Sequence, residues 1–172
     1  MSLPILPAAL REFVFVTELD NAHPFATALF QKKFGTPAPN FGQHFTAWVR
    51  ADESAFRLAS YVHMWTREGR GFLGGGATDG AVLRSLPPEQ QSAIAEAGGL
   101  YVPLAKYVFQ KYATAMPVIY GYCGDEHAFT RHLQAGFVRV PKHPHLMTHF
   151  NWSLTPTQQA EFIAIGDKVG AF

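Results

Sequence analysis

Apolar side chains lie on one helical face near the start of the chain. Phe25, Leu29 and Phe30 recur at the spacing of helical turns. Gly35 follows them, at a position where helices commonly end in a left-handed conformation. The pattern predicts a helix over residues 21–34, followed by a loop rich in Pro, Asn and Gly.

Three strand-like runs follow this loop. They cover residues 45–50, 56–65 and 71–78, and short polar turns separate them. Strands joined by short turns lie next to each other and run in opposite directions. This part of the chain therefore predicts an antiparallel meander of three strands.

The second half of the chain mixes helical and strand-like segments. A helix is expected from Pro87 to Gly98 and Gly99, and residues 100–112 repeat apolar side chains every four residues, as another helix would. Further expected elements are a buried strand at residues 117–122, a helix at 125–135, strands at 138–141 and 146–152, and a terminal helix from Thr155 to about Gly166. The sum is an α+β fold, with a mostly antiparallel sheet and one strand–helix–strand crossover.

The composition is typical of a single compact domain. Hydrophobic residues make up 48% of the 172 residues and charged residues 16%, which are values of a globular chain and not of a disordered one. A chain of this length can bury a substantial core. Within one domain over residues 1–172, we expect an N-terminal helical part (1–44), a core (45–152) and a C-terminal helix (153–172).

The net charge and the single cysteine indicate which binding partners and which cellular compartment to expect. The formal net charge is +1 and no run of Lys or Arg suggests a surface that follows phosphates, so nucleic acid is not expected as a partner. Cys123 is the single cysteine, which excludes an internal disulfide and fits a reducing compartment.

With neither 18 consecutive apolar residues nor a basic leader, the chain is expected to be soluble and cytoplasmic, with no membrane partner. Its many aromatic residues would suit a homodimer.

Two glycine clusters are candidate binding elements. The run from Gly74 to Gly80 lacks the spacing of a dinucleotide or P-loop motif. It indicates either a flexible strand end or a strand whose bare backbone pairs closely with a ligand. Gly98 and Gly99 precede a predicted helix that has Pro103 near its start. That corner is either an ordinary connection between helices or a helix N-terminus that binds phosphate.

Histidine and cysteine provide two further candidates. His145 and His149 would share one face of a strand, but two histidines without a nearby carboxylate are an incomplete metal site, so no metal is expected. Cys123, with His127 four residues later, would be an activated nucleophile if its thiolate lay at a helix entrance. A small buried cysteine is the simpler interpretation.

The segment from Tyr120 to Phe137 combines several features of one family. A buried strand leads into a helix whose first turn carries Asp125, Ala128 provides a close-packing position, and Gly136 ends the helix. This segment resembles the GNAT superfamily of acyl-CoA-dependent N-acyltransferases, in which an Asn-x-x-Ala opens the fourth helix and a Gly-Phe closes it. Asp125 stands at the position of the family's Asn.

The resemblance extends over residues 45–152, in the order of the family's strands and helices. It implies that residues 71–78 are the fourth strand, which accepts the pantetheine of acyl-CoA, and that residues 98–101 are the pyrophosphate loop. The positions that it assigns to cofactor binding are Gly74, Gly75, Gly76, Gly98, Gly99, Leu100, Tyr101, Asp125 and Ala128.

The resemblance also implies candidate catalytic residues. In the family, a tyrosine four residues before the Gly of Gly-Phe protonates the departing CoA thiolate, and His132 occupies that position. A histidine serves as this acid when its imidazolium form is populated. The fourth strand has no carboxylate that would act as the general base. His63 on the preceding strand is the candidate substitute, acting through water.

Two functions follow as alternatives. The first is an N-acyltransferase that moves an acetyl group from acetyl-CoA to an amine of a small molecule or a protein, by direct attack on the thioester. The second is a catalytically silent GNAT-like module used for binding or assembly. The second is kept because the loop near Gly98 lacks the family's Gln/Arg-x-x-Gly-x-Gly/Ala signature and places Glu96 beside the expected pyrophosphate.

Overall fold

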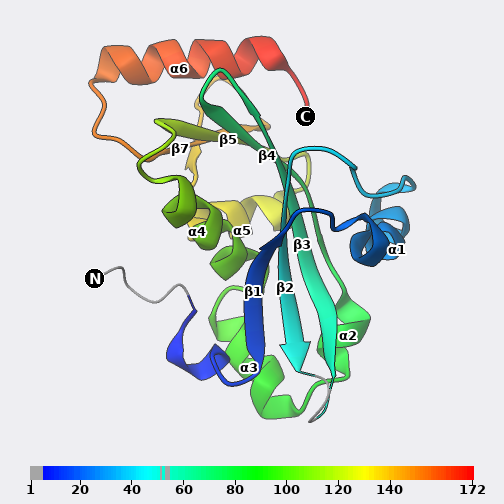
Figure 1. Ribbon diagram of the computed structural model, residues 1–172. Coiled ribbons are helices and arrows are strands. Elements are labelled where there is room, and N and C mark those ends of the chain that lie inside the picture. Colours follow the sequence, from blue (N-terminus) through cyan, green and yellow to red (C-terminus); the bar gives the residue numbers. More distant parts are fainter. Residues whose placement is uncertain (1–5, 51, 53–54) are drawn as a thin grey trace.

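The computed structural model describes residues 6–50, 52 and 55–172, which fold into a seven-stranded sheet flanked by helices (Figure 1). The strands are β1 (Val14–Leu19), β2 (Gln43–Arg50), β3 (Phe56–Arg67), β4 (Arg70–Thr78), β5 (Val118–Tyr122), β6 (Val138–Arg139) and β7 (Leu146–Phe150). Their order in the sheet is β1-β2-β3-β4-β5-β7-β6, and only β4 and β5 pair in parallel among the described strands. The predicted α+β fold with a mostly antiparallel sheet is confirmed.

Helices lie before, between and after these strands along the chain. They are η1 (Ala8–Leu10), α1 (His23–Phe34), α2 (Gly80–Arg84), α3 (Pro88–Glu96), α4 (Tyr101–Tyr112), α5 (Glu126–Ala135) and α6 (Pro156–Val169). Within the described ranges, none of them is long and apolar enough to cross a membrane.

β2, β3 and β4 form the predicted antiparallel meander, and β1 adds a fourth strand to it. β1 pairs antiparallel with β2, from Val14 opposite Val49 to Leu19 opposite His44. The expectation of a purely helical part over residues 1–44 is therefore wrong at this strand. Val14 is 5% exposed and the next residue, Phe15, is 55% exposed, which is the two-residue alternation of a strand.

β4 lies beside β5 only over the first part of β4. Within the described chain, their parallel pairing runs from Gly71 to Leu73, which lies opposite Gly121. β4 then continues to Thr78, whereas β5 ends at Tyr122 and the chain turns into α5. Parallel strands that part in this way create an opening at their carboxyl ends, which is where ligands of such sheets commonly bind.

A β-bulge interrupts β4 beyond the paired stretch. Tyr61 of β3 lies opposite Ala77, but His63 lies opposite Gly74, so one residue of β3 faces two residues of β4. Gly75, inside the bulge, has a φ angle of 61°, which a glycine adopts without the steric penalty of a Cβ atom. The bulge thus leaves its extra residue on β4 outside the regular pairing with β3, beside the opening.

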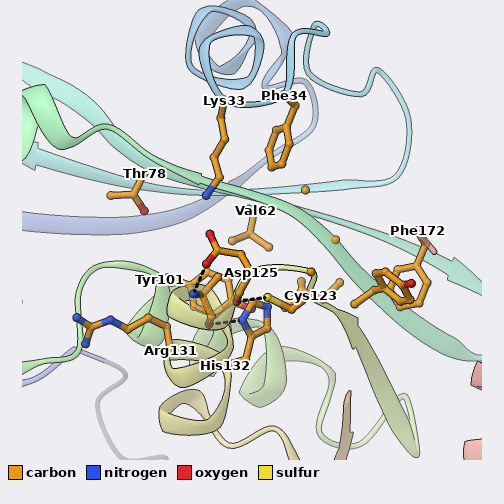
Figure 2. Close-up of a pocket in the computed structure, with 17 residues that line it drawn as sticks. Lys33, Phe34, Val62, Thr78, Tyr101, Cys123, Asp125, Arg131, His132 and Phe172 are labelled. Carbon is orange, nitrogen blue, oxygen red and sulfur yellow. Dashed lines mark hydrogen bonds between the residues drawn. The ribbon is translucent and has the colours of Figure 1, made fainter. Parts of the chain in front are cut away.

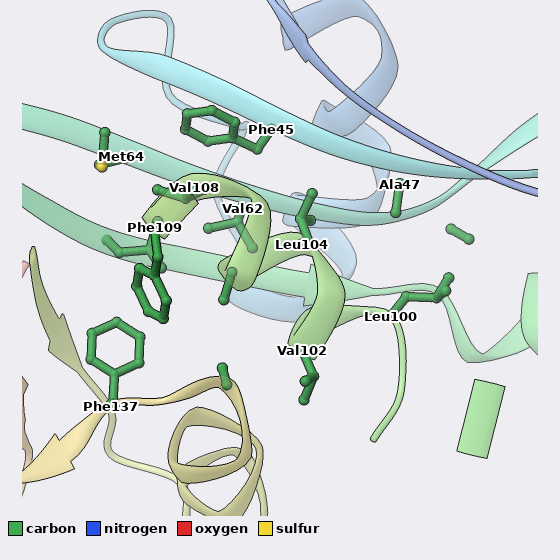
Figure 3. Packing of buried hydrophobic residues seen from close by; sticks show 14 of the residues in the cluster. Phe45, Ala47, Val62, Met64, Leu100, Val102, Leu104, Val108, Phe109 and Phe137 are labelled. Carbon is green, nitrogen blue, oxygen red and sulfur yellow. The ribbon is translucent and has the colours of Figure 1, made fainter. Parts of the chain in front are cut away.

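The main core lies between the sheet and α4 (Figure 3). Leu104 and Val108 are four residues apart on α4, and both are 0% exposed in the same buried cluster as Phe45 and Val62. Burying a side chain of this size contributes about 1.5–3 kcal/mol. This packing holds α4 firmly, and it places Tyr101, the first residue of the helix, against β4.

α6 packs on the face of β5 that lies away from α4. Its predicted capping box at Thr155 is present, but the helix continues past Gly166 and ends only before Gly170. Gly166 has a packing role: a Cβ atom there would lie 2.5 Å from the ring of Tyr120. The Tyr120 hydroxyl also donates a 2.7 Å hydrogen bond to a backbone carbonyl of α6. These contacts explain a glycine inside a helix.

α2 is a helix that the sequence pattern does not predict. Oδ1 of Asp79 accepts hydrogen bonds from the N–H groups of Ala81 and Val82, at 2.8 and 3.3 Å, and so caps the helix. The glycine run that begins at Gly74 is thus divided between the bulged strand and the first residue of α2, Gly80.

Candidate functional site

The opening between β4 and β5 contains a cavity of about 440 Å³ (Figure 2). The residues that line it are Lys33, Phe34, Val62, Leu73, Gly74, Gly75, Gly76, Thr78, Tyr101, Tyr122, Cys123, Gly124, Asp125, Ala128, Arg131, His132 and Phe172. The structure therefore brings together most of the site residues expected from the sequence. His63, Gly98, Gly99 and Leu100 lie outside this lining.

Three glycines form the β4 wall of the cavity. A Cβ atom on Gly76 would lie 3.4 Å from the ring of Tyr101, and one on Gly74 would lie 2.9 Å from the carbonyl oxygen of Phe172. A Cβ atom on Gly75 would lie 3.0 Å from an aromatic ring of α1. Without side chains, this wall lets three other parts of the chain pack directly against the backbone of the strand.

Asp125 lies directly before α5 at the opposite wall. Its Oδ1 accepts a hydrogen bond of 3.4 Å from the Ala128 N–H, so the side chain caps the helix. A negative charge at this end of a helix is favourable because the N–H groups of the first turn point toward it. Ala128 lines the cavity too, and its small side chain leaves room for a ligand beside α5.

Cys123 lies where the chain passes from β5 to α5. It is 6% exposed, and its Sγ–H donates a hydrogen bond of 3.2 Å to the carbonyl oxygen of Asp125. Burial raises the pKa of the thiol, which favours the protonated form at neutral pH. These features support a packed cysteine and not an activated nucleophile. The side chain of His127, its suggested partner, lies outside the described part of the structure.

His132 lies one helical turn after Ala128. Its Nδ1 donates a hydrogen bond of 2.8 Å to the carbonyl oxygen of Ala128, since a carbonyl can only accept. Burial lowers the pKa of the imidazole, and the positive charge of Lys33 lowers it further. The neutral imidazole is therefore favoured at neutral pH. In that form Nε2 accepts a proton, whereas the acid expected from the family resemblance requires imidazolium.

Tyr101 packs between β4 and α5. Its ring centroid lies 4.5 Å from that of His132. The hydroxyl oxygen is buried and has no hydrogen-bond partner among the described residues. Burial, with a smaller contribution from Cys123, raises the pKa of the phenol well above its ordinary value. A buried hydroxyl without a partner destabilises a folded protein by about 1–3 kcal/mol, and such groups are uncommon, so this one requires an explanation.

Gly98 and Gly99 form the corner between α3 and α4. The Gly98 N–H donates to the carbonyl of Ala95 at 3.0 Å, and the Gly99 N–H donates to the carbonyl of Ile94 at 2.8 Å. Both glycines have positive φ angles, 85° and 83°, as residues that cap a helix C-terminus do. These two N–H groups are therefore engaged in capping α3 and are not free to bind pyrophosphate. Leu100 is 0% exposed within the main core.

His63 lies on the face of β3 opposite to that of its neighbour Val62, which lines the cavity. Its Nε2 donates a hydrogen bond of 2.6 Å to the carbonyl oxygen of Phe41, so this nitrogen is not free to accept a proton. Its ring centroid lies 5.6 Å from that of His44, which in turn shares a hydrogen bond of 2.9 Å with the Tyr61 hydroxyl. The contacts of His63 are those of a buried structural residue.

These buried histidines predict a loss of stability in mild acid. Burial lowers the pKa of both His44 and His63. The unfolded chain binds protons at these positions once the pH falls below about 6.5, whereas the folded chain resists protonation. Stability is therefore fully present above that pH and should decline as the pH falls from about 7 to 5. Urea unfolding at both pH values measures this, and equal free energies of unfolding would contradict it.

Lys33 and Phe172 line the cavity although no sequence motif contains them. The side chain of Lys33 points into the cavity from the last turn of α1 (Figure 2). Phe172 reaches it after α6 and packs against Trp65 and Phe72, with ring centroids 6.4 and 5.2 Å away. A basic residue in the last turn of a helix is a common feature, so the pattern alone does not single Lys33 out. Only the packing of α1 and α6 brings both residues to the site.

Comparison with protein-family models finds no match, and comparison of the sequence with curated proteins finds none either. Solved structures, however, resemble this one. The ribosomal-protein-S18-alanine N-acetyltransferase from Escherichia coli is similar with a TM-score of 0.53 and 12% identity, over 83% of this chain and 97% of that chain. The putative N-acetyl transferase YhhK from E. coli, bound to coenzyme A, is similar with a TM-score of 0.52 and 12% identity, over 80% of this chain and 98% of that chain.

One expectation about partners requires correction. The charge pattern predicts no nucleic-acid partner, but the similar structures include AtaT complexed with acetyl-methionyl-tRNAfMet. That structure has a TM-score of 0.42 and 10% identity, over 88% of this chain and 99% of that chain. The prediction of no nucleic-acid partner is not kept, because a net charge describes the whole chain and not one face of its surface.

The likeness to the two Escherichia coli proteins rests on the arrangement of the chain in space. Identities of 12% show the fold and nothing finer. The parallel pairing of β4 with β5 and the helix that begins after Asp125 lie where the resemblance of the segment from Tyr120 to Phe137 places them. The chain therefore has the fold of the GNAT acetyltransferases.

Proposed function

We propose that the protein is an acyl-CoA-dependent N-acyltransferase whose reaction takes place in the cavity between β4 and β5. The observation that carries this proposal is the bulged glycine wall of β4, which faces that cavity. The fold alone would not carry it, because one fold supports many functions. The acceptor would be an amine of a small molecule or a protein.

The lining of the cavity fits a thin, amide-containing chain such as pantetheine. Gly74, Gly75 and Gly76 line one side of the cavity, where the β4 backbone would pair with the amides of such a chain, and the small side chain of Ala128 lines the other side. The orphaned hydroxyl of Tyr101 would gain a partner from a ligand. When bound, acyl-CoA supplies the activated acyl group as a thioester.

Two cations at the cavity would compensate for the missing pyrophosphate loop. Lys33 lines the cavity from α1 and Arg131 lines it from α5. Side chains of this type bind phosphate directly, Arg with two N–H groups and Lys as a point charge. They would take the role that Gly98 and Gly99 do not, since the N–H groups of those glycines are engaged in capping α3.

The geometry supports direct attack of the amine on the thioester. The N–H that the bulge at Gly75 releases from the ladder would donate to the carbonyl oxygen as negative charge develops on it. Nε2 of the neutral His132 would accept the proton that the amine loses. In this proposal His132 acts as a base, and His63 has no chemical role because of its position and its bond to Phe41.

A silent binding module is the second candidate, and one observation favours it. The corner at Gly98 and Gly99 does not present the two glycine N–H groups that a pyrophosphate loop would use. A chain that kept the scaffold after losing acyl-CoA binding would look like this. The two candidates differ in a single measurable property, which is the affinity for acyl-CoA.

Titration with acetyl-CoA by isothermal calorimetry tests the proposal. We expect a dissociation constant in the micromolar range, on the scale of about 1 μM to 1 mM that is usual for enzyme substrates. His132→Ala should slow the release of thiol from saturating acetyl-CoA in the presence of primary amines. His143→Ala is the matched control, because His143 lies outside the cavity lining and pairs with Asp167. Absent binding would support the silent module instead.

A further inference from the structure

Phe172 lines the cavity at the end where β4 and β5 are still paired, and the reaction outlined above assigns it no part. The parallel pairing reaches Leu73 opposite Gly121, and Gly74 directly follows Leu73. The carbonyl oxygen of Phe172 lies 2.9 Å from the position of a Cβ atom on Gly74. Phe172 therefore lies against the backbone of β4 at the point where the two strands begin to separate.

Aromatic packing holds the ring of Phe172 in place. Its centroid lies 5.2 Å from that of Phe72 and 6.4 Å from that of Trp65, with interplanar angles of 87° and 84°. The ring of Tyr122, which also lines the cavity, has its centroid 5.8 Å away. Edge-to-face contacts between aromatic rings are favourable and fix the orientation of a ring. This end of the cavity is thus bounded by a ring that its neighbours hold.

The proposed reaction places the acyl group at this end of the cavity. It sets the thioester carbonyl at Gly75 and the phosphates of CoA at the two cations, one of which is Arg131. Figure 2 shows Arg131 on the side of the cavity away from Phe172. The two substituents of a thioester carbonyl point away from each other. Since the CoA side leads toward Arg131, the acyl chain extends from Gly75 toward Gly74 and Phe172.

We propose that Phe172 limits the length of the acyl group, so that the protein transfers acetyl and excludes longer acyl chains. This inference rests on the proposed acyl-transfer function and adds a specificity-determining residue to it. An acetyl group ends one methyl beyond the carbonyl, whereas each further methylene extends toward the ring of Phe172. Because that ring packs against Phe72 and Trp65, a longer chain must displace it and lose those contacts.

Phe172 comes from outside the two strands that form the opening. It follows α6, whereas Gly74 belongs to β4 and Tyr122 to β5. It also lies outside residues 45–152, the part of the chain that resembles the GNAT family, so the resemblance assigns it no role. Replacing Phe172 therefore enlarges this end of the cavity without changing a residue of either strand.

Rates of thiol release from acetyl-CoA and from n-hexanoyl-CoA, with the same primary amine, test this role. For the wild type, kcat/KM should be at least about 100-fold higher with acetyl-CoA, since one methylene in an apolar pocket changes kcat/KM by about 10- to 200-fold. Phe172→Ala removes the phenyl ring and should bring the two values within about tenfold of each other. Phe172→Leu restores part of the volume and should give an intermediate ratio.

Phe162→Ala is the matched control. Phe162 lies on α6 and packs against the same buried cluster as Phe172, but it lies outside the cavity lining. It should keep the wild-type ratio between the two acyl donors. A ratio measured on one preparation does not depend on the fraction of the protein that is folded, so a loss of stability in either variant does not imitate the expected change.

The results separate this inference from the proposed function. If the wild type neither binds acetyl-CoA nor releases thiol from it, both fail. If the wild type is active but uses both donors equally well, or if Phe172→Ala keeps the wild-type preference for acetyl-CoA, only the role of Phe172 fails. An equal rise of kcat/KM for both donors in Phe172→Ala would show that the ring obstructs every ligand, and this too would overturn the inference.

Discussion

Replacing Gly75 with alanine is expected to lower kcat for acyl transfer by about a hundredfold, the usual effect of losing one oxyanion donor. Gly75 has a φ angle of 61°, and a Cβ atom there would lie 3.0 Å from the ring of Phe30. Either that ring or the strand must shift to relieve this contact, and a shift of the strand would turn the backbone of the bulge away from its present direction. Thiol release at saturating acetyl-CoA measures the effect.

Gly35→Ala is the matched control for this substitution. Gly35 has a similar φ angle of 73°, but no described atom lies within 4 Å of the position of its Cβ. Both variants therefore bear the conformational penalty of about 1–2 kcal/mol for a left-handed residue, and only Gly75→Ala disturbs the cavity wall. Equal kcat values for the two variants would show that the bulge takes no part in the reaction.

Leu104→Ala is expected to reduce the free energy of unfolding by about 2–5 kcal/mol, which is the usual range for a leucine deleted from a packed core. Leu104 is 0% exposed and lies between α4 and the sheet. The substitution leaves a cavity that neighbouring strands can fill only in part, because a sheet does not collapse locally. Urea unfolding monitored by circular dichroism measures the change.

Leu133→Ala provides the comparison, because it is the same substitution on a helix at a side chain that is 44% exposed. Its effect should stay within about 1 kcal/mol, since surface substitutions rarely change stability more. A loss at Leu133 as large as that at Leu104 would contradict the position of the core. If Leu104→Ala also weakens acetyl-CoA binding, α4 transmits the change to the cavity through Tyr101.

Local sequence patterns predict a helix or strand well where residues of that element, or directly beside it, mark its start or its end. The capping box at Thr155, the glycine after α1 and the alternation of strands and polar turns each correspond to an element of the structure. β1 and α2 are missing from the prediction because their signals are weak. β1 lies at the edge of the sheet, where only part of its surface is buried, and α2 is a five-residue helix that depends on its cap at Asp79.

The sequence predicts only part of the candidate site, because the rest depends on contacts that form only in the folded chain. Gly74, Gly75, Gly76, Asp125 and Ala128 lie in segments that resemble the family, and all of them line the cavity. Gly98 and Gly99 have a sequence compatible with a phosphate loop, but their N–H groups are engaged by α3. Whether a backbone N–H is free depends on the partner that the folded chain offers it, and a dipeptide does not reveal that.

Sequence by itself determined the α+β class, the meander, and the strand–helix–strand unit around Asp125, because periodic burial and helix caps act between residues close in the chain. Only the tertiary structure decided the chemistry of the candidate site. It buried His132 in the wall of the cavity that Lys33 also lines, which favours the neutral imidazole, and it left the Tyr101 hydroxyl without a partner among the described residues. Burial and charge act through space, so they depend on segments that the sequence separates and only folding brings together.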